Sequence, residues 1–148
     1  MEMRPATPLD QAAIRHLLLD NRLPVDNLET AAIDFIVARD ATGLMGVIGL
    51  ERFGSAGLLR SLAVRDDQRG RGVGGQLVRA IEGRAVSLGV QQLVLLTETA
   101  APFFGKRGYA AIARDQAPTT VQRSSEFHVI CPASATCMLK PLLIGMLS

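Results

Sequence analysis

The chain has 148 residues, of which 48% are hydrophobic, and it carries 16 basic against 14 acidic side chains. This length suits one domain with a sizeable core, expected over residues 1–148. The net charge of +2 argues against nucleic acid as a partner. No apolar run approaches the roughly 20 residues of a membrane helix. The N-terminus lacks a secretory signal, and two cysteines imply no disulfide framework, so a cytoplasmic location is expected.

The first half of the chain predicts one helix followed by three strands. Thr7-Pro8-Leu9-Asp10 has the cap, proline and acid of a helix start, and the apolar stripe after it ends near Asn21. Apolar segments of strand length follow at 35–39, 45–52 and 58–64. Short turns join them, so we expect antiparallel neighbours.

A glycine-rich turn follows the third strand and precedes a long amphipathic helix. Two arginines stand among its glycines, in the order Arg69, Gly70, Arg71, Gly72, Val73, Gly74, Gly75. A strand that leads into such a turn and a helix N-terminus gathers exposed backbone N–H groups, which bind anions. The turn therefore predicts a phosphate site.

The second half of the chain predicts shorter elements. A buried strand at 92–97 should lie parallel to the strand at 58–64, because a helix connects them. The remaining elements are a short helix at 100–106, a strand at 109–114, a loop at 115–120, and short strands at 126–130 and 136–140.

Two families of phosphate-binding turn match the glycines. Gly70-x-Gly72-x-x-Gly75, with Glu98 downstream, fits the dinucleotide fingerprint. That fingerprint normally directly follows the first strand of a doubly wound sheet. Here an antiparallel pattern precedes the turn, and too little chain follows Glu98 for such a sheet.

The alternative fits the whole chain better. Arg69-x-x-Gly72-x-Gly74, between an apolar strand and a helix, resembles the pyrophosphate signature of the GNAT (GCN5-related) N-acetyltransferases. The resemblance implies an α/β fold with a mixed sheet. In that fold antiparallel N-terminal strands precede a central parallel pair that splays apart at the cofactor site.

The same resemblance implies acetyl-CoA as cosubstrate, a small-molecule amine acceptor, and a homodimer as one possible assembly. No metal is expected, because the two cysteines and two histidines lack the spacing of a metal motif. No membrane partner is expected, because the apolar runs are short. Backbone groups of the glycine turn would hold the pyrophosphate, and the strand edge at Leu62, Ala63 and Val64 would pair with the pantetheine arm. The residues implied in coenzyme binding are Leu62, Ala63, Val64, Arg69, Gly70, Arg71, Gly72, Val73, Gly74, Gly75 and Phe104.

A finer resemblance is to small GNAT proteins found with arsenic-resistance genes and described as amino-acid acetyltransferases. It is carried by Gly49-Leu50-Glu51, by the segments 57–62 and 95–104, and by Cys131-Pro132-Ala133-Ser134-Ala135. It implies an amino-acid-like acceptor, with arsenic- or phosphinate-containing compounds among the candidates. Fold and family do not fix the acceptor.

Acetyl transfer needs a base for the amine proton and an acid for the leaving thiolate. Glu51 is the first candidate base, because a carboxylate is unusual in an otherwise apolar strand. Alternatively, Glu51 faces outward from the strand or forms an ion pair with Arg60. Glu98 is the second candidate, and its alternative role is an acid that favours a helix start. A backbone N–H near Leu62 or Ala63 would polarise the thioester carbonyl.

The general acid is not evident. Many GNAT enzymes have a tyrosine where this chain has Phe104, so the thiolate takes its proton elsewhere or the activity has been lost. Thr97, Ser134 and Cys131 are the remaining protic candidates. Thr97 and Ser134 are also assigned, with Arg60, to acceptor binding. Arg60 would clamp an anionic group or pair with Glu51, which the hairpin places opposite it.

These alternatives leave three functions open. The first is an N-acetyltransferase that acts on a small acceptor by direct transfer in a ternary complex. The second is a non-catalytic acyl-CoA-binding or sensing domain, suggested by Phe104. The third is a protein N-acetyltransferase.

Overall fold

The structure is a computed structural model that describes residues 1–26, 28, 32–127 and 134–142. The chain forms two compact units. The first unit comprises Met1–Glu51 and Arg60–Arg84, and the second comprises Arg52–Leu59 and Ala85–Ser148. Strand β4 (Ala56–Val64) contributes residues to both units.

The strands of the first unit follow the order β1-β2-β3-β4. Strands β1 (Glu2–Pro5), β2 (Ile33–Asp40) and β3 (Gly43–Phe53) pair antiparallel, with Met3 opposite Ala38 and Ile36 opposite Ile48. The three predicted strands are confirmed. Strand β1 was not predicted, because four residues are too few for an alternating pattern to be recognised.

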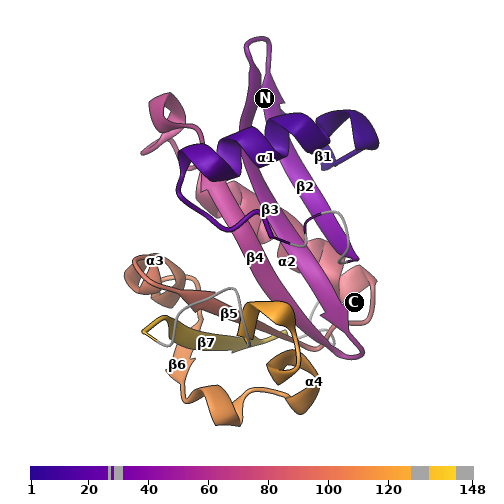
Figure 1. The fold of residues 1–148 in the computed structure, drawn as a ribbon, viewed down its shortest axis with the longest axis vertical. Coiled ribbons are helices and arrows are strands. Elements are labelled where there is room, and N and C mark those ends of the chain that lie inside the picture. The colour runs from indigo at the N-terminus through magenta and orange to yellow at the C-terminus, as the bar shows by residue number, and fades with distance from the viewer. Residues whose placement is uncertain (27, 29–31, 128–133, 143–148) are drawn as a thin grey trace. The chain divides into compact units, whose positions relative to one another are not determined.

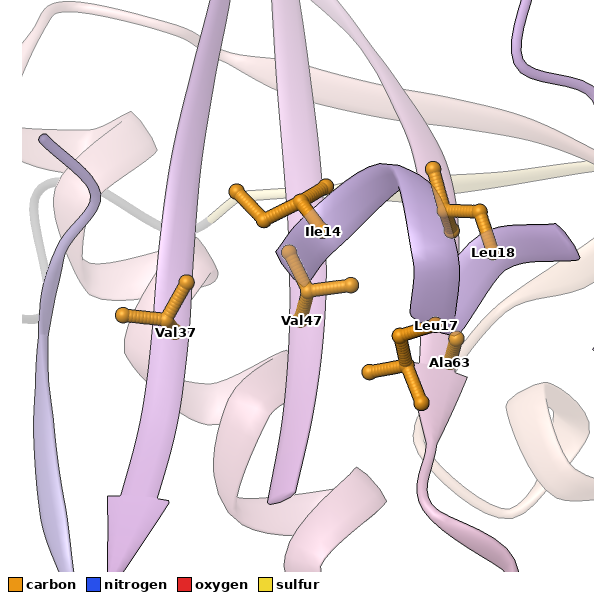
Figure 2. Close-up of a cluster of buried hydrophobic side chains, with 6 residues drawn as sticks. All are labelled: Ile14, Leu17, Leu18, Val37, Val47 and Ala63. Carbon is orange, nitrogen blue, oxygen red and sulfur yellow. The ribbon is translucent and has the colours of Figure 1, made fainter. Parts of the chain in front are cut away.

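Helix α1 (Gln11–Asp20) covers one face of these strands. The predicted start is confirmed: a 3-10 turn, η1 (Pro8–Asp10), leads into α1, and Asp10 Oδ2 accepts the Thr7 backbone N–H at 2.8 Å. Figure 2 shows the apolar side of α1 directed at the sheet. The buried cluster there comprises Ile14, Leu17, Leu18, Val37, Val47 and Ala63.

Helix α2 (Val73–Ser87) lies behind the same strands in Figure 1, on the face opposite α1. It approaches β3 closely at Gly46. A Cβ atom there would lie 2.8 Å from Leu77 Cδ1, 3.1 Å from the Ala63 carbonyl oxygen and 3.2 Å from Val73 Cγ1. Because β3 has no side chain at this point, the first turn of α2 packs directly on the strand.

The second unit continues from β4 in the order β4-β5-β7-β6. Strand β5 (Gln92–Thr97) runs parallel to β4, with Ala56, Gly57 and Leu58 opposite Gln92, Leu93 and Val94. Strands β6 (Ala110–Ile112) and β7 (Thr136–Pro141) pair antiparallel, and α3 spans Ala101–Gly105. The core cluster comprises Ala56, Leu58, Val94, Ala117, Val121 and Cys137.

Two predictions for the second unit are wrong. The expected loop at 115–120 contains a 3-10 turn, η3 (Arg114–Gln116), and the start of α4 (Thr119–Gln122), whose Val121 is buried in the core. The expected strand at 126–130 begins with helical backbone at Glu126 and Phe127, where Ser124 Oγ accepts the Phe127 N–H at 3.3 Å. Residues 128–130 lie outside the described residues.

Within the described ranges, no helix has both the length and the apolar character needed to span a bilayer.

Candidate functional site

The glycine turn leaves an unobstructed backbone at the start of α2. Gly70 and Gly72 adopt left-handed φ values of 78° and 81°, and a Cβ atom at either would meet no atom within 4 Å. The Gln76 N–H donates to the Gly72 carbonyl at 3.1 Å, which is the first bond of α2. The N–H groups of residues 73–75 therefore precede the helical hydrogen-bond ladder and can bind an anion.

Arg65 attaches the beginning of this turn to the β2–β3 hairpin. Its backbone N–H donates to the Met45 carbonyl at 2.7 Å, and its guanidinium donates to the Leu44 carbonyl at 3.3 Å and to Thr42 Oγ1 at 3.0 Å. Nε donates to Asp67 Oδ1 at 2.6 Å, and this bond holds the pKa of the Asp67 carboxyl below its usual range. Sequence reasoning missed Arg65, because its partners are distant in the chain.

The two arginines of the signature differ in their surroundings. The Arg69 guanidinium donates to Asn21 Oδ1 at the end of α1 and lies 3.6 Å from Asp66 Oδ1. Arg71 is exposed on the turn. Beside Arg69 the first unit has a pocket of about 540 Å³. Its lining comprises Leu17, Asp20, Asn21, Arg22, Arg65, Asp66 and Arg69.

The end of β4 carries a local distortion just before the predicted pantetheine edge. Ser61 has a left-handed φ of 62°, which is uncommon for a residue other than glycine and interrupts regular strand geometry. Leu62 and Val64 are half-buried, whereas the Ala63 side chain packs under α1. Ala63 can therefore meet a ligand only through its backbone.

Glu51 and Arg60 meet in the first unit. Arg60 Nη1 lies 3.3 Å from Glu51 Oε1; the Arg60 side chain is fully buried and that of Glu51 is 13% exposed. The Arg60 guanidinium also donates to the Asp26 carbonyl at 3.5 Å and to Ser61 Oγ at 3.4 Å. The structure thus contains the ion pair that the hairpin spacing predicts.

The other predicted site residues belong to the second unit. Thr97 Oγ1 accepts the Ala100 N–H at 2.9 Å at the start of α3, and Glu98 and Ser134 are exposed. Phe104 is buried edge-on against Phe103 and Tyr109, with ring centroids 5.0 and 5.4 Å away. Cys131 lies outside the described residues.

Antiparallel strands, one parallel pair and flanking helices form the mixed α/β fold that the sequence predicts. Residues 31–111, more than half of the chain, match the family model of the acetyltransferase (GNAT) domain. The chain therefore belongs to the GNAT acetyltransferase family.

Solved structures agree with this fold. The N-acetylglutamate synthase of Neisseria gonorrhoeae, complexed with coenzyme A and N-acetyl-glutamate, matches with a TM-score of 0.81 and 21% identity over 95% of this chain. Rv2747 of Mycobacterium tuberculosis, in complex with CoA and NLQ, matches with a TM-score of 0.80 and 22% identity. The match covers 97% of this chain and 100% of Rv2747. An aminoglycoside 6'-N-acetyltransferase complexed with coenzyme A matches with a TM-score of 0.73 and 17% identity. The match covers 97% of this chain and 98% of that enzyme.

These identities show a shared fold. The chain spans 35% of the length of the Neisseria synthase.

Proposed function

We propose that the protein transfers an acetyl group from acetyl-CoA to the primary amine of a small, anionic, amino-acid-like acceptor, directly in a ternary complex. The observation that carries the proposal is the open glycine turn at the N-terminus of α2. Its left-handed Gly70 and Gly72 leave backbone N–H groups accessible, and Arg71 adds positive charge at the surface. A diphosphate suits such a site.

The Arg60–Glu51 pair supports an anionic acceptor. A buried guanidinium is costly unless it is paired, and a planar fork also fits a carboxylate, arsonate or phosphinate group. Arg60 would exchange part of its contact with Glu51 for the acceptor anion. Thr97 and Ser134 remain proposed acceptor-binding residues, because each carries a hydroxyl group. On this proposal, amino acids and their arsenic- or phosphinate-containing analogues are the acceptors to test first.

The proposed reaction is a direct displacement. The amine lone pair attacks the thioester carbonyl carbon and forms a C–N bond, and a backbone N–H near Leu62 or Ala63 stabilises the developing oxyanion. The C–S bond then breaks and the thiolate leaves with the electron pair. The amine proton passes to Glu51, or to Glu98 as the second candidate base, and water or a nearby hydroxyl group protonates the thiolate.

Glu51 retains a free oxygen for the role of base. Arg60 donates to Oε1, and no hydrogen bond to Oε2 occurs among the residues that the structure describes. The pair therefore leaves one carboxylate oxygen for the proton while it holds the other in place.

A thiol-release screen tests the proposed function. Purified protein and acetyl-CoA are mixed with amino acids, their phosphinate and arsenic analogues, an aminoglycoside and a lysine peptide. The expected result is release of coenzyme A with at least one small anionic amine, and its loss when Arg60 is replaced by Met. Release only with the peptide would contradict the small acceptor and favour a protein N-acetyltransferase.

A non-catalytic acyl-CoA-binding domain is the second candidate, and Phe104 favours it. This side chain occupies the expected position of the acid, is buried among aromatic rings and has no proton to donate. Calorimetric binding of acetyl-CoA without thiol release across the whole panel would support this role. Turnover of any member would reject it.

A further inference from the structure

Helix α1 ends in a rigid cap that fixes Asn21. The Leu23 N–H donates to the Leu18 carbonyl at 2.9 Å and the Arg22 N–H to the Leu19 carbonyl at 3.0 Å. These two bonds form a Schellman motif, in which Arg22 is the left-handed residue with a φ of 57°. Leu23 packs against the cluster beneath α1, which is the apolar contact expected of this motif.

The Asn21 side chain is oriented by this cap. Its Nδ2 donates to the Leu17 carbonyl at 2.9 Å, one turn back along α1. An amide that donates through Nδ2 presents Oδ1 on its other side as an acceptor. Asn21 therefore offers a fixed acceptor at the end of the helix.

Arg69 uses this acceptor. Its Nη2 donates to Asn21 Oδ1 across a separation of 48 residues, and its Nη1 lies 3.6 Å from Asp66 Oδ1. The Arg69 guanidinium is thus held by protein groups at the edge of the turn. Arg69 and Arg71 are both exposed on the turn, and Arg69 is the one that these contacts hold.

We infer that Asn21 is a positioning residue for the coenzyme turn, and that it acts through Arg69. Arg65 fixes the beginning of the turn to the β2–β3 hairpin, and the Asn21–Arg69 bond fixes it to α1 just before Gly70. The N–H groups are then held in place before a diphosphate arrives, which lowers the entropic cost of binding. This inference rests on the proposed use of the turn for coenzyme A.

The two arginines of the turn would then have different roles. Arg69 orders the backbone, and Arg71 supplies charge to the ligand. Loss of the anchor should increase the motion of the turn in the free protein. Loss of the charge should weaken binding and reduce its salt dependence while leaving the free turn unchanged.

Hydrogen exchange of the free protein and calorimetry with coenzyme A separate these roles. Asn21→Ala should speed exchange at the backbone N–H groups of residues 66–72 and raise the Kd for coenzyme A about three- to tenfold, with the same salt dependence as wild type. Asn21→Asp keeps an acceptor for Arg69 but loses the Nδ2 bond to the Leu17 carbonyl, so exchange of residues 66–72 should be slower than in Asn21→Ala. Arg71→Gln should weaken binding without any change in exchange.

A double-mutant cycle completes the test. If Asn21 acts through Arg69, Asn21→Ala combined with Arg69→Gln weakens binding no more than Arg69→Gln alone. Additive effects would overturn the inference, as would unchanged exchange in Asn21→Ala. If wild type fails to bind coenzyme A, the proposed function fails, and the exchange result still decides whether Asn21 orders the turn.

Discussion

The Arg60 guanidinium lies 3.3 Å from Glu51 Oε1, and no part of the Arg60 side chain is exposed. Removal of Glu51 takes a charged partner away from this buried cation. We predict that Glu51→Ala lowers the free energy of unfolding by about 3 kcal/mol. Urea titration measures this loss. The paired replacement Glu51→Leu with Arg60→Met should recover most of it, and a double variant as unstable as the single one would contradict the role of the pair.

The same carboxylate is predicted to take the amine proton. Glu51→Gln keeps the size of the side chain and an acceptor for Arg60, so it isolates the loss of the base. We expect kcat to fall by about 100-fold or more while the affinity for coenzyme A stays unchanged. Glu98→Gln is the matched variant, and the larger loss identifies the base. Rates within about threefold of wild type for both variants would exclude both residues.

Asp10 predicts how stability depends on pH. Hydrogen bonds from Arg4, at 2.8 and 3.2 Å, lower the pKa of this buried carboxyl to about 2. Because the pKa in the folded state lies below the unfolded value near 3.8, the stabilisation is complete above about pH 4 and is lost as the pH falls toward 2. A shift of this size corresponds to about 2 kcal/mol.

Asp10→Asn should therefore be less stable than wild type by about 2 kcal/mol at pH 7, and the difference should shrink at pH 2. Urea unfolding at several pH values measures it. Asp20→Asn, at the exposed end of α1, controls for the loss of a surface carboxylate. A constant difference between Asp10→Asn and wild type from pH 7 to 2 would show that the ion pair with Arg4 contributes nothing.

Arg71 is predicted to contact the diphosphate as an exposed charge. Arg71→Gln should raise the Kd for coenzyme A about tenfold at low salt and much less at high salt, because screening weakens an exposed charge contact. Arg79→Gln, on the exposed face of α2, removes the same charge away from the turn. Calorimetry at two salt concentrations measures both variants. Equal effects of the two would indicate attraction by overall charge rather than a contact.

The sequence predicts the long elements well, because hydrophobic periodicity needs length. Helices α1 and α2 and strands β2 to β5 carry several apolar positions each, and their order identifies the fold. Strand β1 and helix α4 have four residues each, and their place depends on packing that no local pattern records. The strand expected at 126–130 has suitable residues, but Glu126 and Phe127, the two of them that the structure describes, have helical backbone, and Ser124 Oγ accepts the Phe127 N–H.

The candidate site likewise has a part that the sequence predicts and a part that it does not. The glycine turn is local, so its sequence is sufficient to locate it. The Glu51–Arg60 pair was predictable, because the turn of a hairpin determines which residues face each other. The contacts of Arg65 with the β2–β3 hairpin and of Arg69 with Asn21 join surface residues more than 20 positions apart, and no pattern of residue types indicates them.

Gly46 contributes to the site because it has no side chain. It bears no functional group and lies 24 residues before the first glycine of the turn, yet even a methyl group there would press on Leu77 and the Ala63 carbonyl. The end of the Leu77 side chain would have to move, and the Ala63 carbonyl and Val73 would have to shift slightly to make room. A side chain at this position would therefore disturb the packing beneath the helix that carries the anion site, and a search for charged or nucleophilic residues would overlook it.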